Sequence, residues 1–145
     1  MKAHEIRGKQ EFLLAVYVDR RTVAAADGPQ FYSEPEQTLQ LGSFVRKQGF
    51  KVKAHKHINL RTPATVYSTQ EVLIVIRGRI QVAVYDCDDS LVWVGNIGEG
   101  EAVHLIDGGH AVEVLENGTV FYEVKQGPYM GADDKVQLSP YEQSR

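Results

Sequence analysis

From Leu39 to Val124 the chain is a succession of short apolar runs, separated by turn residues. Each run is rich in Val and Ile or alternates apolar with polar residues, which is typical of β-strands. About eight to ten strands at regular spacing, with no convincing helical pattern, predict an all-β sandwich or small barrel. The predicted strands span residues 39–45, 50–58, 71–77, 79–85, 91–97, 102–106, 110–115 and 119–124.

Turn residues between these runs predict how neighbouring strands connect. Gly78 alone separates the runs 71–77 and 79–85, a pattern that indicates a β-hairpin. Asn117-Gly118, between the last two runs, is a hairpin signal as well. A further apolar run, Phe12–Val18, precedes the series, and the polar tail 127–145 is expected to pack loosely or at an interface. No repeat or linker divides the chain, so the sequence predicts one domain, residues 1–145, with its core barrel at about 39–124.

The composition limits the partners and the surroundings that fit this chain. The 145 residues carry a formal net charge of −3, which disfavours a nucleic-acid partner. No apolar run reaches the roughly 18 residues of a membrane span, and the N-terminus has no hydrophobic signal core. Cys87 is the single cysteine, so an internal disulfide is excluded and a reducing compartment is favoured. We therefore expect a cytoplasmic protein that binds neither membrane nor nucleic acid.

Four residues along the strand series have the chemistry of metal ligands. His55 and His57 lie two positions apart in one predicted strand and point to the same face of it. Glu71 opens the next predicted strand and can lie beside them if the two strands pair, and His110 supplies a fourth donor. Three imidazoles and one carboxylate suit a divalent transition metal ion, without distinguishing iron, manganese, nickel, copper and zinc. His104 is expected outside this set, because the Gly-Gly turn before His110 breaks the alternation between them.

The spacing of these residues resembles the first motif of the cupin superfamily. The motif reads here as Gly49-x5-His55-x-His57, followed by Glu71-x6-Gly78. The family places its glutamate closer to the second histidine, so residues 58–70 must loop out for Glu71 to reach the site. The resemblance covers about 39–124 and implies a double-stranded β-helix, or jelly roll, with the metal ligands facing into the barrel.

The second cupin motif is matched less closely. Gly98 and Gly100 supply its glycine-rich turn and His110 its histidine, but Leu105 stands in place of the usual proline and Asp107 in place of a glycine. After the barrel, residues 123–129 are similar to small single-domain cupin metalloproteins found with surface-polysaccharide genes. That likeness implies a sugar-derived substrate.

Polar residues near the ligands are candidates for a pocket around the metal. Lys53 and Arg77 share strand faces with His55 and Glu71 by simple alternation, so they can bind an anionic part of a substrate. Arg61, in the inserted segment, is a third candidate for substrate binding. Tyr67, also in the inserted segment, is a candidate acid or base.

Two classes of function fit these observations. In the first, a bound ion acts as a Lewis acid on a small polar, sugar-derived substrate in isomerase, epimerase or lyase chemistry, or activates dioxygen as a dioxygenase if it is iron. In the second, the protein binds or senses a sugar or organic acid without turnover. A metal-free epimerase or isomerase would need a second group beside His110, such as Asp107. Exposed sheet edges and the run Phe12–Val18 favour a homodimer formed by strand exchange.

Overall fold

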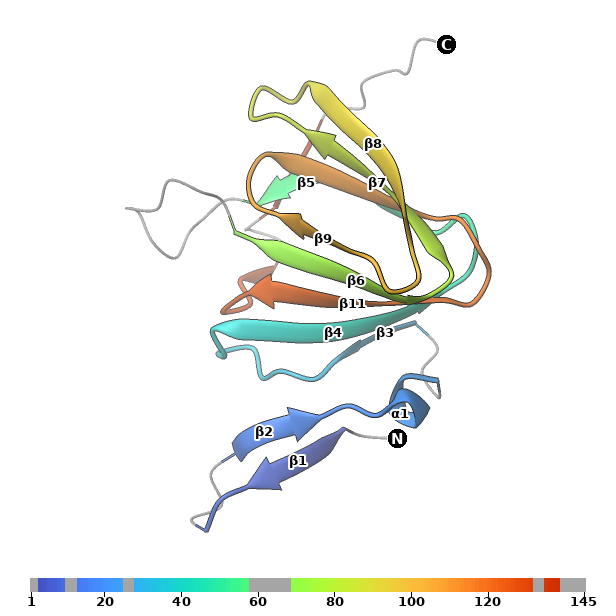
Figure 1. Ribbon diagram of the computed structural model, residues 1–145. Coiled ribbons are helices and arrows are strands. Elements are labelled where there is room, and N and C mark those ends of the chain that lie inside the picture. Colours follow the sequence, from blue (N-terminus) through green and yellow to red (C-terminus); the bar gives the residue numbers. More distant parts are fainter. Residues whose placement is uncertain (1–2, 10–12, 25–27, 58–68, 132–134, 139–145) are drawn as a thin grey trace.

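The computed structural model describes residues 3–9, 13–24, 28–57, 69–131 and 135–138 of the chain (Figure 1). In this part of the chain, two five-stranded antiparallel sheets lie face to face and a two-stranded sheet precedes them. The β5 sheet has the strand order β12-β5-β10-β7-β8, and the β6 sheet has the order β3-β4-β11-β6-β9. The strands are β1 His4–Arg7, β2 Leu13–Tyr17, β3 Gly28–Phe31, β4 Leu39–Arg46, β5 Lys51–His57, β6 Glu71–Arg77, β7 Arg79–Tyr85, β8 Leu91–Gly98, β9 Ala102–Leu105, β10 Gly109–Val114, β11 Thr119–Gln126 and β12 Lys135–Gln137. The all-β prediction is confirmed.

Both predicted hairpins are wrong. β6 and β7 follow one another across Gly78, yet β6 pairs with β9 and β11 whereas β7 pairs with β8 and β10. β10 and β11, on either side of Asn117-Gly118, also belong to different sheets. The physical reason is that both partners of each pair carry an apolar face that must reach the same core. A turn that crosses from one sheet to the other buries both faces, whereas a flat hairpin leaves them in one sheet.

The crossing at Gly78 depends on the absence of a side chain there. Its φ of 79° lies in the left-handed region that glycine adopts readily. A Cβ at this position would also collide with the Thr119 hydroxyl of β11. The same hydroxyl lies 2.7 Å from the Glu116 carbonyl and 3.3 Å from the Arg79 amide, so it links the two crossings.

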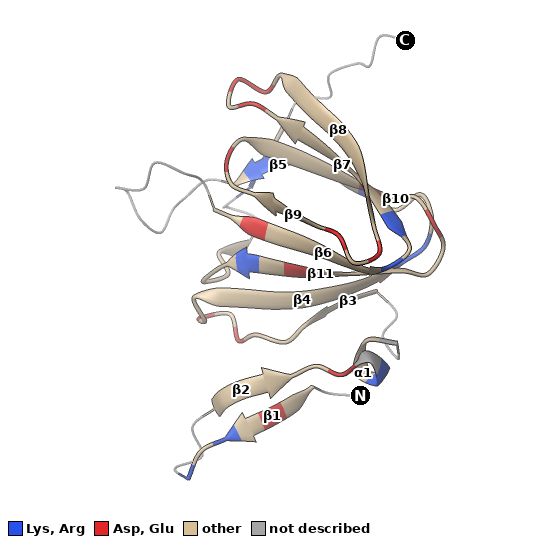
Figure 2. Cartoon of the chain, in the orientation of Figure 1, with Lys and Arg blue, Asp and Glu red and all other residues tan. Residues whose placement is uncertain are grey.

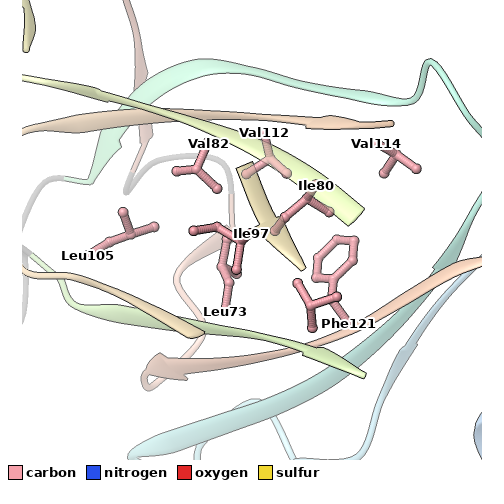
Figure 3. Packing of buried hydrophobic residues seen from close by; sticks show 9 residues of the cluster. Leu73, Ile80, Val82, Ile97, Leu105, Val112, Val114 and Phe121 are labelled. Atoms are coloured by element: carbon pink, nitrogen blue, oxygen red, sulfur yellow. The ribbon is translucent and has the colours of Figure 1, made fainter. Parts of the chain in front are cut away.

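The core fills the space between the two large sheets (Figure 3). Leu73 and Phe121 point into it from the β6 sheet, and Ile80 and Val112 meet them from the β5 sheet. The rings of Phe44 and Phe121 are parallel, with centroids 5.0 Å apart, and extend the core along β4. Burying side chains of this size contributes roughly 1.5–3 kcal/mol each. The core therefore holds the sheets together around their inward faces, on which the site is also built.

Four of the described elements were not predicted from the sequence, namely β1, α1, β3 and β12. The helix α1, Arg20–Ala24, has five residues, too few for a helical period to show, and Asp19 caps it by accepting a hydrogen bond from the Thr22 amide at 2.7 Å. β3 contains Pro29, which an edge strand tolerates. β12 pairs with β5 and is followed by the buried Leu138, so this part of the tail does not pack loosely.

The N-terminal strands β1 and β2 form their own sheet, apart from the two large sheets in Figure 1. Leu14 and Tyr17 of β2 are exposed. The structure describes one chain, so the homodimer stays a prediction. The described part of the chain holds no helix with the length and apolar character of a membrane span.

Candidate metal centre

A β-bulge in β5 turns the histidine pair into the barrel. β5 pairs with β10, and their register shifts so that Lys53 and Ala54 together lie opposite Ala111. Before the bulge, Val52 packs against the core, and beyond it His55 is buried. Strict alternation would put Val52 and His55 on opposite faces of the strand, so the extra residue lets both face inward.

The four predicted ligands come together between the two sheets. His110 lies directly opposite His55 in the β5 sheet, and one ring nitrogen each of His55, His57 and His110 lie within 4.8 Å of one another. Glu71 opens β6 in the facing sheet, with Oε2 2.9 Å from His110 Nε2 and Oε1 3.2 Å from His57 Nε2. All four side chains are buried. The carboxylate therefore reaches the histidines from across the barrel, without the pairing of β5 and β6 that the sequence had made a condition for this contact.

His55 is oriented as a metal-ligating imidazole is. Its Nδ1–H donates to the Lys53 carbonyl at 2.8 Å, within the bulge, which leaves the lone pair on Nε2. That Nε2 is buried and has no hydrogen-bond partner among the described residues. Burial, and next the charge of a protonated His110, lower the pKa of His55 from 6.5 to about 4. A neutral imidazole with an unpartnered buried nitrogen fits a divalent transition metal, which binds the neutral form.

Glu71 supplies the negative charge of the cluster. Burial works against its ionised form, but the contacts with His110 and His57 outweigh burial and hold the pKa of Glu71 well below its usual value. Lys125 lies on the neighbouring strand β11, and its ammonium nitrogen is 3.9 Å from Glu71 Oε1. An ionised carboxylate among three imidazoles completes a donor set of nitrogen and oxygen atoms that suits such an ion.

Two other predicted site residues, Lys53 and Arg77, do not join this cluster. Lys53 is exposed, because the bulge breaks the alternation that would place it beside His55. Arg77 lies at the opposite end of β6 from Glu71, and its Nε donates to the Gly118 carbonyl at 3.0 Å.

Three further residues of the sequence analysis lie away from the cluster or beyond what the structure describes. His104 is exposed, with Nε2 3.0 Å from Gln70 Oε1, and it is absent from the group of three histidines, as expected. Arg61 and Tyr67 lie outside the described residues.

Sequence reasoning missed two charged residues of β11, Glu123 and Lys125. They follow the buried Phe121 at two-residue spacing and so share its inward face. Both line a cavity of about 380 Å³. Figure 2 shows the acidic and basic positions of β11 beside an acidic position of β6. An inward-facing Phe-x-Glu-x-Lys in an otherwise apolar strand was the signal that could have identified them.

The acid–base behaviour of Glu123 is opposite to that of His55. Burial, and next the negative charge of Glu71, raise the pKa of Glu123 from 4.5 to about 7. The folded protein therefore favours neutral Glu123, and this contribution to stability is lost as pH rises from 4.5 through 7. For His55, whose folded pKa is depressed, stability is lost as pH falls below 6.5 towards 4. In the metal-free protein the two effects oppose each other between pH 7 and pH 5.

Single variants are expected to separate these two effects. Without metal, Glu123→Gln should lose about 2 kcal/mol of unfolding free energy between pH 7 and pH 5, because only the His55 effect remains. His55→Leu should gain about 2 kcal/mol over the same interval. Urea unfolding of chelator-treated protein at both pH values measures this. Slopes of the same sign in the two variants would contradict the assignment.

Comparisons with known proteins place the fold. No protein-family model and no curated protein matches the sequence. Among solved structures, oxalate decarboxylase from Bacillus subtilis is 21% identical, with a TM-score of 0.56 over 71% of this chain. The coconut allergen cocosin is 16% identical, with a TM-score of 0.51 over 62% of this chain. The chain spans 24% and 22% of the lengths of these two proteins.

Both solved structures are cupin-fold proteins. They resemble the described strands of this chain, two antiparallel sheets that enclose the histidine cluster. At identities this low the likeness concerns the fold. The chain therefore has the cupin fold, the double-stranded β-helix that its sequence motifs imply.

Proposed function

We propose that the protein holds a divalent transition metal ion through His55, His57, Glu71 and His110 and acts on a small polar substrate in the barrel. One observation carries the proposal: three buried imidazoles and a carboxylate converge, and the buried Nε2 of His55 has no partner among the described residues. Buried polar atoms in proteins are nearly always satisfied, so an unpartnered imidazole nitrogen aimed at other donors indicates a ligand.

The choice of ion rests on donor chemistry. Imidazole and carboxylate ligands without a thiolate suit manganese, iron, nickel, copper and zinc. The oxalate decarboxylase of Bacillus subtilis has Mn(II) centres, and a manganese centre on the same fold supports a divalent ion here. Cys87, the single cysteine, is exposed and lies outside the cluster.

An ion bound by these residues supplies a Lewis acid that polarises a substrate oxygen. The chain itself supplies the surroundings. Both sheets shield the cluster from water, since its four side chains are at most 7% exposed. Lys125 lies beside Glu71 and also lines the neighbouring cavity, so a substrate there meets an ammonium group next to the metal ligands. This arrangement supports isomerase, epimerase or lyase chemistry on a sugar-derived substrate, or dioxygenase chemistry if the ion is iron.

Binding without turnover is the second candidate function, and the cavity lined by Glu123 and Lys125 favours it equally. Both functions place a ligand in this cavity, and binding alone does not require a metal ion. They differ in whether the metal-loaded protein changes its ligand chemically.

Metal reconstitution followed by substrate trials tests the proposal. Chelator-treated protein is loaded separately with each of the five metals, and bound metal is measured by mass spectrometry after desalting. Near-stoichiometric metal together with turnover of a small sugar or acid supports the enzyme. Stoichiometric metal with a ligand that is bound and recovered unchanged supports the binding function. Protein that retains none of the metals contradicts the metal-dependent function and favours binding without turnover.

A further inference from the structure

A cavity of about 380 Å³ adjoins the metal centre along the inward face of the β6 sheet. Its volume lies near the lower end of the roughly 300–1,000 Å³ typical of small-molecule sites. The residues that line it are Phe31, Ser33, Pro35, Gln40, Glu123, Lys125, Tyr129 and Lys135. They combine apolar and aromatic surface with a few polar groups, the usual composition of a site for a small organic ligand.

Lys125 connects this cavity to the predicted metal ligands. It pairs with Glu71 in the ladder between β11 and β6 and with Gln40 in the ladder between β11 and β4. Its side chain is only 7% exposed, and Nζ lies 3.9 Å from Glu71 Oε1. The same side chain lines the cavity. A ligand in the cavity therefore lies within reach of a buried cation next to the metal centre.

The next row of the sheet supplies the second inward-facing charge. Glu123 pairs with Leu73 of β6 on one side and with Gly42 of β4 on the other. A Cβ at Gly42 would come within 3.2 Å of two ring carbons of Phe31, so the missing side chain makes room for that ring at the cavity wall. The Phe31 ring thus lies against Gly42, the residue that pairs with Glu123, and both Phe31 and Glu123 line the cavity.

Backbone hydrogen bonds hold the part of the cavity wall that follows β11. The Tyr129 amide donates to the Pro35 carbonyl at 2.8 Å, and the Gly127 amide donates to the Thr38 carbonyl at 2.8 Å. Gln40 Nε2 donates to the Gln37 carbonyl at 2.9 Å, which leaves its Oε1 as an acceptor. These contacts hold the residues around the cavity in place, so its polar groups have defined positions.

The charges of the lining select the ligand. Lys125 and Lys135 bring two ammonium groups, against one carboxyl group from Glu123. The lining is therefore net positive even when Glu123 is ionised. Either form of the Glu123 carboxyl group has an acceptor oxygen for a ligand hydroxyl group.

We infer that this cavity binds a small hydroxylated carboxylic acid, with Lys125 and Lys135 holding its carboxylate, Glu123 hydrogen-bonding a hydroxyl group, and Phe31 and Tyr129 covering its carbon chain. The inference rests on the proposed function in one respect: it makes such an acid the substrate class of the metal centre. Binding itself depends on residues that are not metal ligands, so it can be measured without metal.

Two probes that differ at one end test the inference. D-gluconate and D-glucitol share a hydroxylated carbon chain, but one ends in a carboxylate and the other in a hydroxymethyl group. Binding to chelator-treated protein is followed by isothermal titration and by amide chemical shifts. Gluconate is expected to bind saturably, and at least about tenfold more tightly than glucitol, because only gluconate pairs with the lysines. Equal affinity for both probes, or no binding of gluconate, overturns the inference.

Variants of the two lysines locate the binding. Lys125→Met should weaken gluconate at least about tenfold, whereas Lys125→Arg should stay within about threefold of the wild type. Lys51→Met is the matched control, since Lys51 is exposed and pairs with Glu113 outside the cavity. If Lys125→Met does not fold, the exposed Lys135 can be replaced by Met, with an expected loss of at least about threefold. Unchanged affinity in the folded lysine variants overturns the assignment.

A metal titration of the same proteins separates the two proposals. Wild-type protein that binds gluconate without metal but never retains a metal ion contradicts the proposed function and leaves the cavity assignment standing. Protein that retains metal but does not bind gluconate contradicts the cavity assignment and leaves the proposed metal centre standing.

Discussion

Replacing His55 and His57 together by alanine is expected to reduce bound metal from near one ion per chain to background. The substitution removes both imidazoles of β5, so only Glu71 and His110 of the four predicted ligands remain. Changing a residue that merely supports a metal ligand costs about 10–100-fold in affinity, so loss of two ligands should exceed a hundredfold. Mass spectrometry of desalted protein, after loading with a single metal, measures the result.

His104→Ala is the matched control for this variant. His104 lies on β9, which pairs with β6, but it is exposed and its Nε2 lies 3.0 Å from Gln70 Oε1, outside the cluster. Its removal should leave bound metal unchanged. Circular dichroism of the metal-free proteins checks that the β-sheets persist in both variants. Full metal retention by the folded double variant would show that the ion binds elsewhere.

The ligand residues could be predicted because a local pattern specifies them. His55 and His57 stand two positions apart, and the pleat of any strand puts such a pair on one face. The prediction does not depend on which strands are neighbours. Glu71 and His110 were added because Glu71-x6-Gly78 and His110 resemble parts of family motifs, although Glu71 lies farther from His57 than in the family. The strand content was predictable for the same local reason, since alternation and β-branched residues are visible within each run.

The position of each residue relative to the others required long-range structure. The sequence shows no sign of the bulge at Lys53 and Ala54, because a bulge is defined by the partner strand β10. Simple alternation therefore placed Lys53 in the site, and the structure places it outside. Likewise, Gly78 has the same local signature in a hairpin and in a crossing between sheets. Only the shared core, to which both Leu73 and Ile80 contribute, decides between the two.

The crossings between the sheets explain how one small barrel forms both a metal centre and a cavity. Because β6 faces β5 across the barrel, Glu71 meets the histidines side chain to side chain. Because β6 also pairs with β11, the same carboxylate has Lys125 beside it. Glu71 is thus the predicted metal ligand that lies beside a residue of the cavity wall, Lys125, so its charge acts on both sites.

Replacing Glu71 by glutamine is expected to destabilise the metal-free protein by about 3 kcal/mol at pH 7, as removal of one member of a buried ion pair does. Glutamine keeps the shape of the side chain, so the loss comes from charge. His110, His57 and the buried Lys125 all lose the carboxylate that lies 2.9, 3.2 and 3.9 Å from them. Metal affinity should fall by at least about a hundredfold, because an anionic oxygen ligand becomes neutral. Urea unfolding with chelator present measures the first effect, and competition with a metal indicator measures the second.

A second substitution separates these two consequences. Lys125→Met removes the cation and keeps a chain of similar length, so Glu71→Gln should cost much less stability in the Lys125→Met background. The difference between the two backgrounds is the coupling energy of the pair, expected at about 1–3 kcal/mol. Metal affinity should stay low in the double variant, since nothing restores the anionic ligand. Equal destabilisation in both backgrounds would mean that Glu71 and Lys125 do not interact. Recovered metal affinity in the double variant would mean that Glu71 acts on the ion only through the charge balance of the cavity.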